Sequence, residues 1–174
     1  MSLSAAKLAD LDLDLDLDAL AERLGAHCRA RGVTVTAAES CTGGGVASAI
    51  TAVAGSSAWF ETGYVTYANG AKTRLLGVSE ALLAEHGAVS RAVVEAMVRG
   101  ACRDSGAGIG VAISGIAGPD GGSADKPVGT VWLAWGDAEQ GEATCYRFDG
   151  DRRAVREQAV REALVGLVRR LAPD

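Results

Sequence analysis

The segment Thr36–Gly45 most constrains the fold, because it joins a strand, a sharp glycine-rich turn and a helix in direct succession. The β-branched run Val33–Ala38 predicts a buried strand. The small and apolar residues Val46–Val53 predict a helix that lies on a sheet. Such a turn directs backbone N–H groups and the positive end of a helix dipole toward one point. With Ser40 and Cys41 in the turn, this point suits a phosphate or a developing oxyanion.

The size and charge of the chain narrow its class. Its 174 residues predict one domain with a proper core. The net charge of −5 argues against nucleic acid as the main partner, because phosphate binding depends on Lys and Arg. The apolar stretches are far shorter than a membrane span, and the N-terminus has no basic-then-apolar leader. We therefore expect a cytoplasmic protein without membrane association.

The cysteines and histidines argue against a metal centre. Cys28, Cys41, Cys102 and Cys145 are scattered along the chain, with no C-x-x-C spacing. Reduced and buried thiols are the expected state of all four. The chain has only two histidines, so a His-based metal cluster is not expected either. We expect no metal and no cofactor.

The N-terminal residues 1–17 form an acidic low-complexity extension, ahead of a single domain over residues 18–174. Leu and Asp alternate strictly over Leu11–Asp18. Asp is a poor strand former, so a frayed extension is the better interpretation than a strand. Asp18 is the predicted N-cap of a helix over Ala19–Arg31.

The rest of the chain alternates predicted helices and strands. The expected elements are a strand over 58–67, helices over 71–76 and 80–86 with Ser79 capping the second, a helix after Ser90, a strand over 109–113, strands over 128–135 and 143–148 in a hairpin, and a long helix after Asp151. This order predicts an α/β fold, a three-layer α/β/α sandwich around a mixed, mostly parallel sheet of about five strands.

A second glycine-rich loop, Ser114–Ser123, follows the apolar strand 109–113. Ligands bind at the carboxyl edge of open α/β sheets. If the strands before the two loops are parallel, both loops lie at that edge. We therefore expect them to face one cleft.

Ser40 needs a base if it is to act as a nucleophile. Neither histidine has a convincing setting. A lysine can serve when burial or neighbouring positive charge lowers its pKa. Only three of the 17 Lys and Arg residues are Lys, at positions 7, 72 and 126. Since Arg cannot be deprotonated in proteins, a Lys near the candidate site indicates a removable proton.

Tyr67 and Lys72 follow the second predicted strand. If the helix over 71–76 coils back toward the first turn, both side chains share the cleft with Ser40. A Tyr–Lys pair can relay a proton, because the ammonium favours the phenolate. From spacing alone, a structural tyrosine, a solvated lysine and a simple turn serine remain open alternatives.

Several motifs together resemble one known family. They are Ala38-Glu-Ser-Cys-Thr-Gly-Gly44, Gly55-Ser-Ser-Ala-Trp-Phe60, Val65-Thr-Tyr67 with Lys72, Gly87-Ala-Val-Ser90, Ser114-Gly-Ile-Ala-Gly-Pro-Asp-Gly-Gly122 and Lys126-Pro-Val-Gly-Thr-Val131. Over roughly residues 20–171 the chain resembles the C-terminal domain family of the competence/damage-inducible protein CinA. The activity of that family is nicotinamide-nucleotide amidohydrolase, also called NMN deamidase.

The resemblance implies an activity and a set of site residues. The family converts nicotinamide mononucleotide (NMN) to nicotinate mononucleotide and ammonia without a metal, in pyridine nucleotide salvage. Its catalytic serine, tyrosine and lysine match Ser40, Tyr67 and Lys72. The expected substrate-binding residues are Cys41, Thr42, Gly43 and Gly44 in the first turn, and Ser114, Gly115, Gly118 and Thr130 at the second loop. For the second loop, the expected contact with phosphate or ribose rests on loop chemistry. As a hypothesis, Ser40 attacks the amide carbon and the N–H groups of the turn hold the oxyanion.

Three alternatives stay open. Cys41 is a second candidate nucleophile, since a helix N-terminus lowers the pKa of a thiol. The substrate can be another small amide. The chain can also be a regulatory module that binds nucleotides without chemistry. The expected partner is a small nucleotide, and the sequence does not decide between a monomer and a homo-oligomer.

Overall fold

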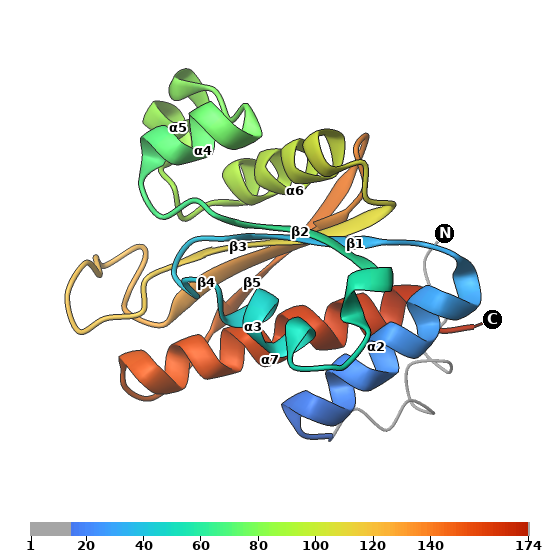
Figure 1. The fold of residues 1–174 in the computed structure, drawn as a ribbon. Helices are drawn as coiled ribbons and strands as arrows, with labels where there is room; N and C mark the ends of the chain where they lie inside the picture. The colour runs from blue at the N-terminus through green and yellow to red at the C-terminus, as the bar shows by residue number, and fades with distance from the viewer. Residues whose placement is uncertain (1–14, 174) are drawn as a thin grey trace.

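A five-stranded mixed sheet forms the centre of the computed structural model, which describes residues 15–173 (Figure 1). The strands are β1 (Val35–Glu39), β2 (Phe60–Val65), β3 (Ile109–Gly115), β4 (Thr130–Gly136) and β5 (Gly141–Arg147). Their order is β2-β1-β3-β4-β5. The first two pairs in this order are parallel and the last two antiparallel. Only β4 therefore runs against the others, which confirms the predicted mixed, mostly parallel sheet.

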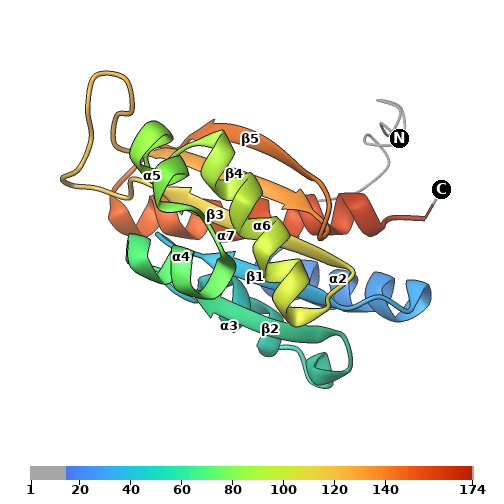
Figure 2. The ribbon, with the colours of Figure 1, turned by 90° about the horizontal axis from the view of Figure 1, so that it is seen from above.

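Helices cover both faces of this sheet (Figures 1 and 2). On one face lie α2 (Leu17–Arg31), α3 (Gly45–Thr51) and α7 (Arg152–Leu171); on the other lie α4 (Asn69–Leu76), α5 (Glu80–His86) and α6 (Arg91–Ser105). The predicted three-layer α/β/α architecture is confirmed. Within residues 15–173, no helix is both long and apolar enough to cross a membrane.

The core consists of two layers of apolar side chains, one on each side of the sheet. The larger layer includes Leu20 of α2, Val35 of β1 and Leu164 of α7. The smaller layer, under α6, includes Val94 and Met97. Because both sheet faces are covered, all five residues of β1 are buried. This explains why the strand reads as a short continuous run instead of an alternation.

Helix capping agrees with the sequence at three starts and differs at one. The side chains of Ser79, Ser90 and Asp151 each accept a hydrogen bond from the backbone N–H three residues on, as predicted. For the first helix the cap is Asp16, which accepts from the Ala19 N–H at 2.8 Å. The prediction that Asp18 caps this helix is wrong, because the helix begins two residues earlier at Leu17.

The second strand covers only Phe60–Val65, because Ser56–Ala58 form a short 3-10 helix before it. For the predicted acidic extension 1–17, residues 1–14 lie outside the described part of the chain.

The parallel strands β1 and β3 bring the two glycine-rich loops together. Glu39 at the end of β1 pairs in register with Ile113 of β3. The Ser40 N–H then donates to the Ile113 carbonyl at 3.0 Å. Ser40 and Ser114 therefore leave the same edge of the sheet side by side, as predicted for loops that follow parallel strands.

The cysteines are free thiols, and one of them departs from its predicted burial. Cys28, Cys41 and Cys102 are buried, whereas Cys145 is exposed. Cys145 lies on β5, which forms an edge of the sheet and faces solvent over much of its length. The prediction of four buried thiols is therefore wrong at Cys145.

Candidate active site

A cleft of about 270 Å³ opens at the carboxyl edge of β1 and β3. The predicted site residues that line it are Ser40, Cys41, Tyr67, Lys72, Ser114, Gly115 and Gly118. Residues from both glycine-rich loops are among them, so the expectation that the loops face one cleft is confirmed. The other predicted binding residues, Thr42, Gly43, Gly44 and Thr130, do not line this cleft.

The turn after β1 is possible because of its glycines. Gly43 and Gly44 have φ values of 60° and 101°, a left-handed conformation that disfavours other residues. The turn lets α3 begin at Gly45, where a side chain would collide with Val160 of α7. Ser40 is therefore fixed at the mouth of a tight turn and keeps 9% of its surface exposed.

Glu39 occupies the N-terminus of α3, a role that the sequence analysis missed. Its carboxylate accepts hydrogen bonds from the backbone N–H groups of Gly44, Val46 and Ala47, at 2.9 to 3.1 Å. The side chain is almost fully buried, with 1% exposed. The prediction that this helix end is available for an anion is therefore wrong, because the Glu39 carboxylate already accepts its N–H groups.

Two other amide groups of the turn remain available. Within residues 15–173, the backbone N–H groups of Cys41 and Thr42 donate to no oxygen atom, whereas Ser40, Gly43 and Gly45 donate to carbonyl groups. Cys41 lies on the cleft, directly after the candidate nucleophile. Any oxyanion contact from this turn must therefore come from its middle and not from α3.

Lys72 reaches Ser40 from α4. Its Nζ lies 3.2 Å from Ser40 Oγ, 2.9 Å from the Thr66 carbonyl oxygen and 3.1 Å from the Tyr67 carbonyl oxygen. The side chain is 1% exposed. Within the described residues it has no carboxylate within ion-pair distance. Burial lowers the pKa of the Lys72 amine below its ordinary value.

The phenol of Tyr67 has a different partner from the one predicted. Its hydroxyl accepts a hydrogen bond from Arg152 at 3.0 Å. Lys72 contacts Tyr67 only through the backbone carbonyl. The Tyr67 side chain lines the cleft and is 59% exposed. The sequence correctly placed Tyr67 beside the cleft but did not indicate this contact with α7.

Cys41 is an unfavourable nucleophile in this structure. Burial raises the pKa of its thiol to about 11. Cysteine attacks as the thiolate, which is scarce at neutral pH when the pKa is so high. The helix end that could lower this pKa is occupied by Glu39. The surroundings of Cys41 therefore disfavour its thiol as a nucleophile.

Two arginines of α7 connect the loops, and the sequence analysis overlooked both. Arg152 donates to the Gly118 carbonyl at 2.8 Å in addition to Tyr67. Arg156 donates to the carbonyl groups of Cys41 and Thr42, both at 3.1 Å. The start of α7 thus holds both glycine-rich loops. Arg152 holds the loop Ser114–Ser123, and Arg156 holds the turn that follows β1.

A sequence signal for these arginines exists. Arg152 and Arg153 lie in the first turn of a helix, where the helix dipole disfavours cations, and Arg156 follows in the second turn. Such a placement needs a compensating partner. Carbonyl oxygens of the two loops supply it for Arg152 and Arg156.

The chain belongs to the CinA C-terminal domain family, which it matches over residues 17–171. Its α/β/α fold and the cleft between two glycine-rich loops are thus those of a member of this family.

Individual relatives are similar over most of their length. The chain is 64% identical to the nicotinamide-nucleotide amidohydrolase PncC of Pseudomonas putida, over 86% of this chain and 93% of that protein. It is 58% identical to the protein of the same name from Escherichia coli K12, over 83% and 88%. A crystal structure of a CinA superfamily protein from Klebsiella pneumoniae superposes with a TM-score of 0.86 at 44% identity, covering 90% of this chain and 98% of that one.

Proposed function

We propose that this protein is a metal-independent serine amidohydrolase that converts NMN to nicotinate mononucleotide and ammonia. The observation that carries the proposal is the contact between the buried Lys72 amine and Ser40 Oγ. The names of the Pseudomonas putida and Escherichia coli relatives support the choice of substrate. Among the described residues, no three His, Cys, Asp or Glu side chains are grouped as metal ligands. The proposed mechanism assigns proton transfer to Ser40 and Lys72, because Lys72 Nζ lies 3.2 Å from Ser40 Oγ and the Tyr67 hydroxyl contacts Arg152 instead.

The three oxygen neighbours of Lys72 Nζ allow the amine to act as a base once it is neutral. A neutral amine has two N–H bonds and one lone pair. The carbonyl groups of Thr66 and Tyr67 accept the two N–H bonds. The lone pair is then left for the hydroxyl proton of Ser40. Burial favours this neutral form, because it penalises the charged ammonium.

The reaction follows from this arrangement in two halves. Ser40 Oγ attacks the carboxamide carbon of NMN while its proton passes to Lys72. Lys72 then protonates the departing nitrogen, the C–N bond breaks, and ammonia leaves an ester on Ser40. Water attacks this ester and gives a proton to Lys72. The C–O bond to Ser40 then breaks, Lys72 returns that proton to Ser40 Oγ, and nicotinate mononucleotide leaves as a carboxylate whose acid proton passes to solvent.

The developing oxyanion needs donors near Ser40. We assign this role to the backbone N–H of Cys41, which follows the nucleophile and lies on the cleft. Arg156 supports it by holding the carbonyl groups of Cys41 and Thr42. Tyr67 and Arg152 form a wall of the cleft, where Arg152 also brings a positive charge suited to the substrate phosphate.

The test is ammonia release from NMN by the purified protein after EDTA treatment. We expect turnover by the wild type and by Ser105→Ala, a control at the far end of α6. Ser40→Ala and Lys72→Met should lose at least about 10³-fold in kcat, the scale at which nucleophile and base act. Mass spectrometry of a quenched reaction should show the acyl group on the peptide that contains Ser40.

The same experiment separates the alternatives. Full activity of Ser40→Ala would refute the serine mechanism. A wild type that binds NMN but leaves it unchanged would be the binding module without chemistry. Turnover of a different amide, with none of NMN, would keep the mechanism and refute the substrate.

A further inference from the structure

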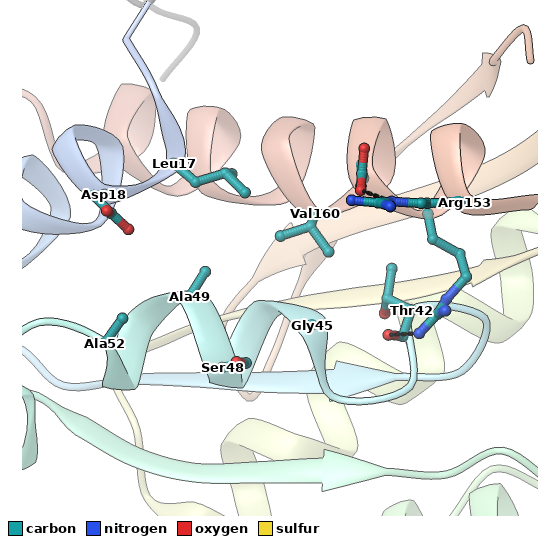
Figure 3. Close-up of a pocket in the computed structure, with 11 residues that line it drawn as sticks. Leu17, Asp18, Thr42, Gly45, Ser48, Ala49, Ala52, Arg153 and Val160 are labelled. Atoms are coloured by element: carbon teal, nitrogen blue, oxygen red, sulfur yellow. Dashed lines mark hydrogen bonds and ion pairs between the residues drawn. The ribbon is translucent and has the colours of Figure 1, made fainter.

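We call residues 40–44, which carry the proposed nucleophile Ser40, the nucleophile turn. A second hollow lies behind this turn, and we call this hollow the α3–α7 groove. It has a volume of about 510 Å³ and lies between α3, α7 and the start of α2 (Figure 3). It shares no lining residue with the Ser40 cleft. Thr42 lines this groove and its neighbour Cys41 lines the cleft. The two hollows are therefore separated by the turn itself.

One end of the groove contains a hydroxyl group without a hydrogen-bond partner and two arginine side chains. The Thr42 hydroxyl is buried, with the residue 1% exposed, and has no hydrogen-bond partner among the described residues. A buried hydroxyl without a partner costs free energy. Arg156 lies beside it and makes no ion pair with a carboxylate in residues 15–173. Arg153 at the same end forms an ion pair with Glu157, which also lines the groove and is the carboxylate partner of Arg153 among the described residues.

The rest of the groove suits a flat ring. Figure 3 shows Val160 and Ala49 between the Arg153 end and the end formed by Leu17 and Asp18. Small apolar side chains leave room for a planar group to lie against α3 and α7. Asp18 is exposed at the far end, where its carboxylate can accept hydrogen bonds from an amino group.

We propose that the α3–α7 groove is a regulatory binding site for a nucleoside monophosphate. The phosphate contacts Arg153 and Arg156, whose guanidinium groups provide charge-assisted hydrogen bonds. The base lies against Ala49 and Val160, with its amino group toward Asp18. The site is distinct from the cleft in which NMN is bound and hydrolysed.

Arg156 couples the groove to Ser40. In the free protein its guanidinium holds the carbonyl groups of Cys41 and Thr42. A bound phosphate competes for the same N–H groups and weakens that hold. The ligand therefore loosens the turn that presents Ser40 and lowers kcat. This effect on catalysis, unlike the binding itself, rests on the proposed function.

The first test is calorimetric binding of AMP and of inorganic phosphate to the whole protein. AMP should bind at least about tenfold more tightly than phosphate, because only AMP uses the apolar wall. Arg153→Ala, at a side chain that is 85% exposed, should weaken AMP binding about tenfold. Arg91→Ala is the matched control, an exposed arginine in the first turn of α6 on the opposite face.

Two bulky variants separate the hollows. Ala49→Trp fills the groove and should abolish AMP binding, whereas Val89→Trp narrows the Ser40 cleft and should preserve it. The second readout is hydrogen exchange, which AMP should accelerate at the amides of residues 43–45, with about tenfold more AMP needed in Arg153→Ala than in the wild type. With NMN as substrate, AMP should lower kcat of the wild type, and Arg153→Ala should need about tenfold more AMP for the same decrease.

The outcomes that overturn the proposal are distinct. Absence of AMP binding at 10 mM ligand, or equal binding by the wild type and Arg153→Ala, refutes the site. Loss of binding in Val89→Trp, with Ala49→Trp unaffected, moves the ligand to the cleft. Equal affinity for AMP and phosphate refutes the nucleotide class. If AMP binds as expected but NMN is not hydrolysed, the proposed function fails while the site stands.

Discussion

The amine of Lys72 lies 3.2 Å from the hydroxyl oxygen of Ser40, although 32 positions separate the two residues in the chain. β1 ends just before Ser40, and β2 runs parallel beside it, so the chain after β2 returns along the same sheet edge. Lys72 lies near the start of α4, and from there its side chain reaches Ser40. The fold thus brings the proposed nucleophile and the proposed base together from two adjacent strand ends.

The proposed base makes activity depend on pH. Because burial lowers the pKa of Lys72, its neutral form increases as the pH rises through a value below the ordinary 10.5 of lysine. We expect kcat/KM for NMN to rise along a limb with an apparent pKa below 10.5. A pH–rate profile checks this. Lys72→Arg should be inactive at every pH, since arginine keeps its proton; a flat profile in the wild type would contradict the assignment.

The same shift affects stability. The unfolded chain binds the Lys72 proton more tightly than the folded protein does. The cost of burying the ammonium is therefore fully present below the folded pKa and disappears as the pH approaches 10.5. The free energy of unfolding of Lys72→Met, relative to that of the wild type, should be highest at neutral pH and should fall progressively toward pH 10.5. Urea unfolding at several pH values measures this difference. A difference independent of pH would show that the pKa of Lys72 is unchanged on folding.

Cys41 should be dispensable for chemistry. With its pKa raised to about 11 by burial, little thiolate exists at pH 7. We expect Cys41→Ala to retain kcat within about threefold, because the proposed oxyanion donor is its backbone N–H and not its thiol. Steady-state assays with NMN decide the point. A loss as large as that of Ser40→Ala would transfer the nucleophile role to Cys41.

Tyr67 and Arg152 should affect substrate binding more than proton transfer. The Tyr67 hydroxyl contacts Arg152, and Lys72 contacts only the Tyr67 backbone. Tyr67→Phe should therefore keep the pH profile of the wild type and lose only a fewfold in kcat/KM. Arg152→Ala should raise KM by at least about tenfold, as expected when a charged contact to phosphate is lost. A Tyr67→Phe enzyme without the pH limb would instead make the phenol part of the proton relay.

Glu39 should determine the stability of the nucleophile turn. Glu39→Gln keeps the shape but removes the charge that three N–H groups of α3 share. We expect a loss of about 1 to 2 kcal/mol in the free energy of unfolding, on the scale of a helix cap. Denaturant titration measures it. A matched Glu80→Gln variant, at the exposed start of α5, should stay within about 0.5 kcal/mol of the wild type.

The sequence predicted the elements and the common edge of the two loops well, because these features depend on local patterns. Turn glycines, caps such as Ser90 and the apolar run of β3 are visible in a short window of residues. Contacts across the fold are not. The Tyr67 hydroxyl, for example, meets Arg152, which lies 85 positions away, and no local pattern pairs them.

The occupied end of α3 was missed for a related reason. A strand, a glycine turn and a helix indicate an anion site by themselves. Whether that site is free depends on the rotamer of one buried side chain, Glu39. The residue was part of the motif, but its direction became visible only in three dimensions.

The contacts of α7 also set the time at which the site can exist in a growing chain. Arg152 and Arg156 come late in the sequence, yet they hold Gly118 and the Cys41–Thr42 carbonyl groups. A nascent chain that ends before residue 152 lacks both arginines, although Ser40 and Lys72 have already been synthesised. During translation, the nucleophile turn therefore gains its support only when the last helix leaves the ribosome, and incomplete products are made without a supported site.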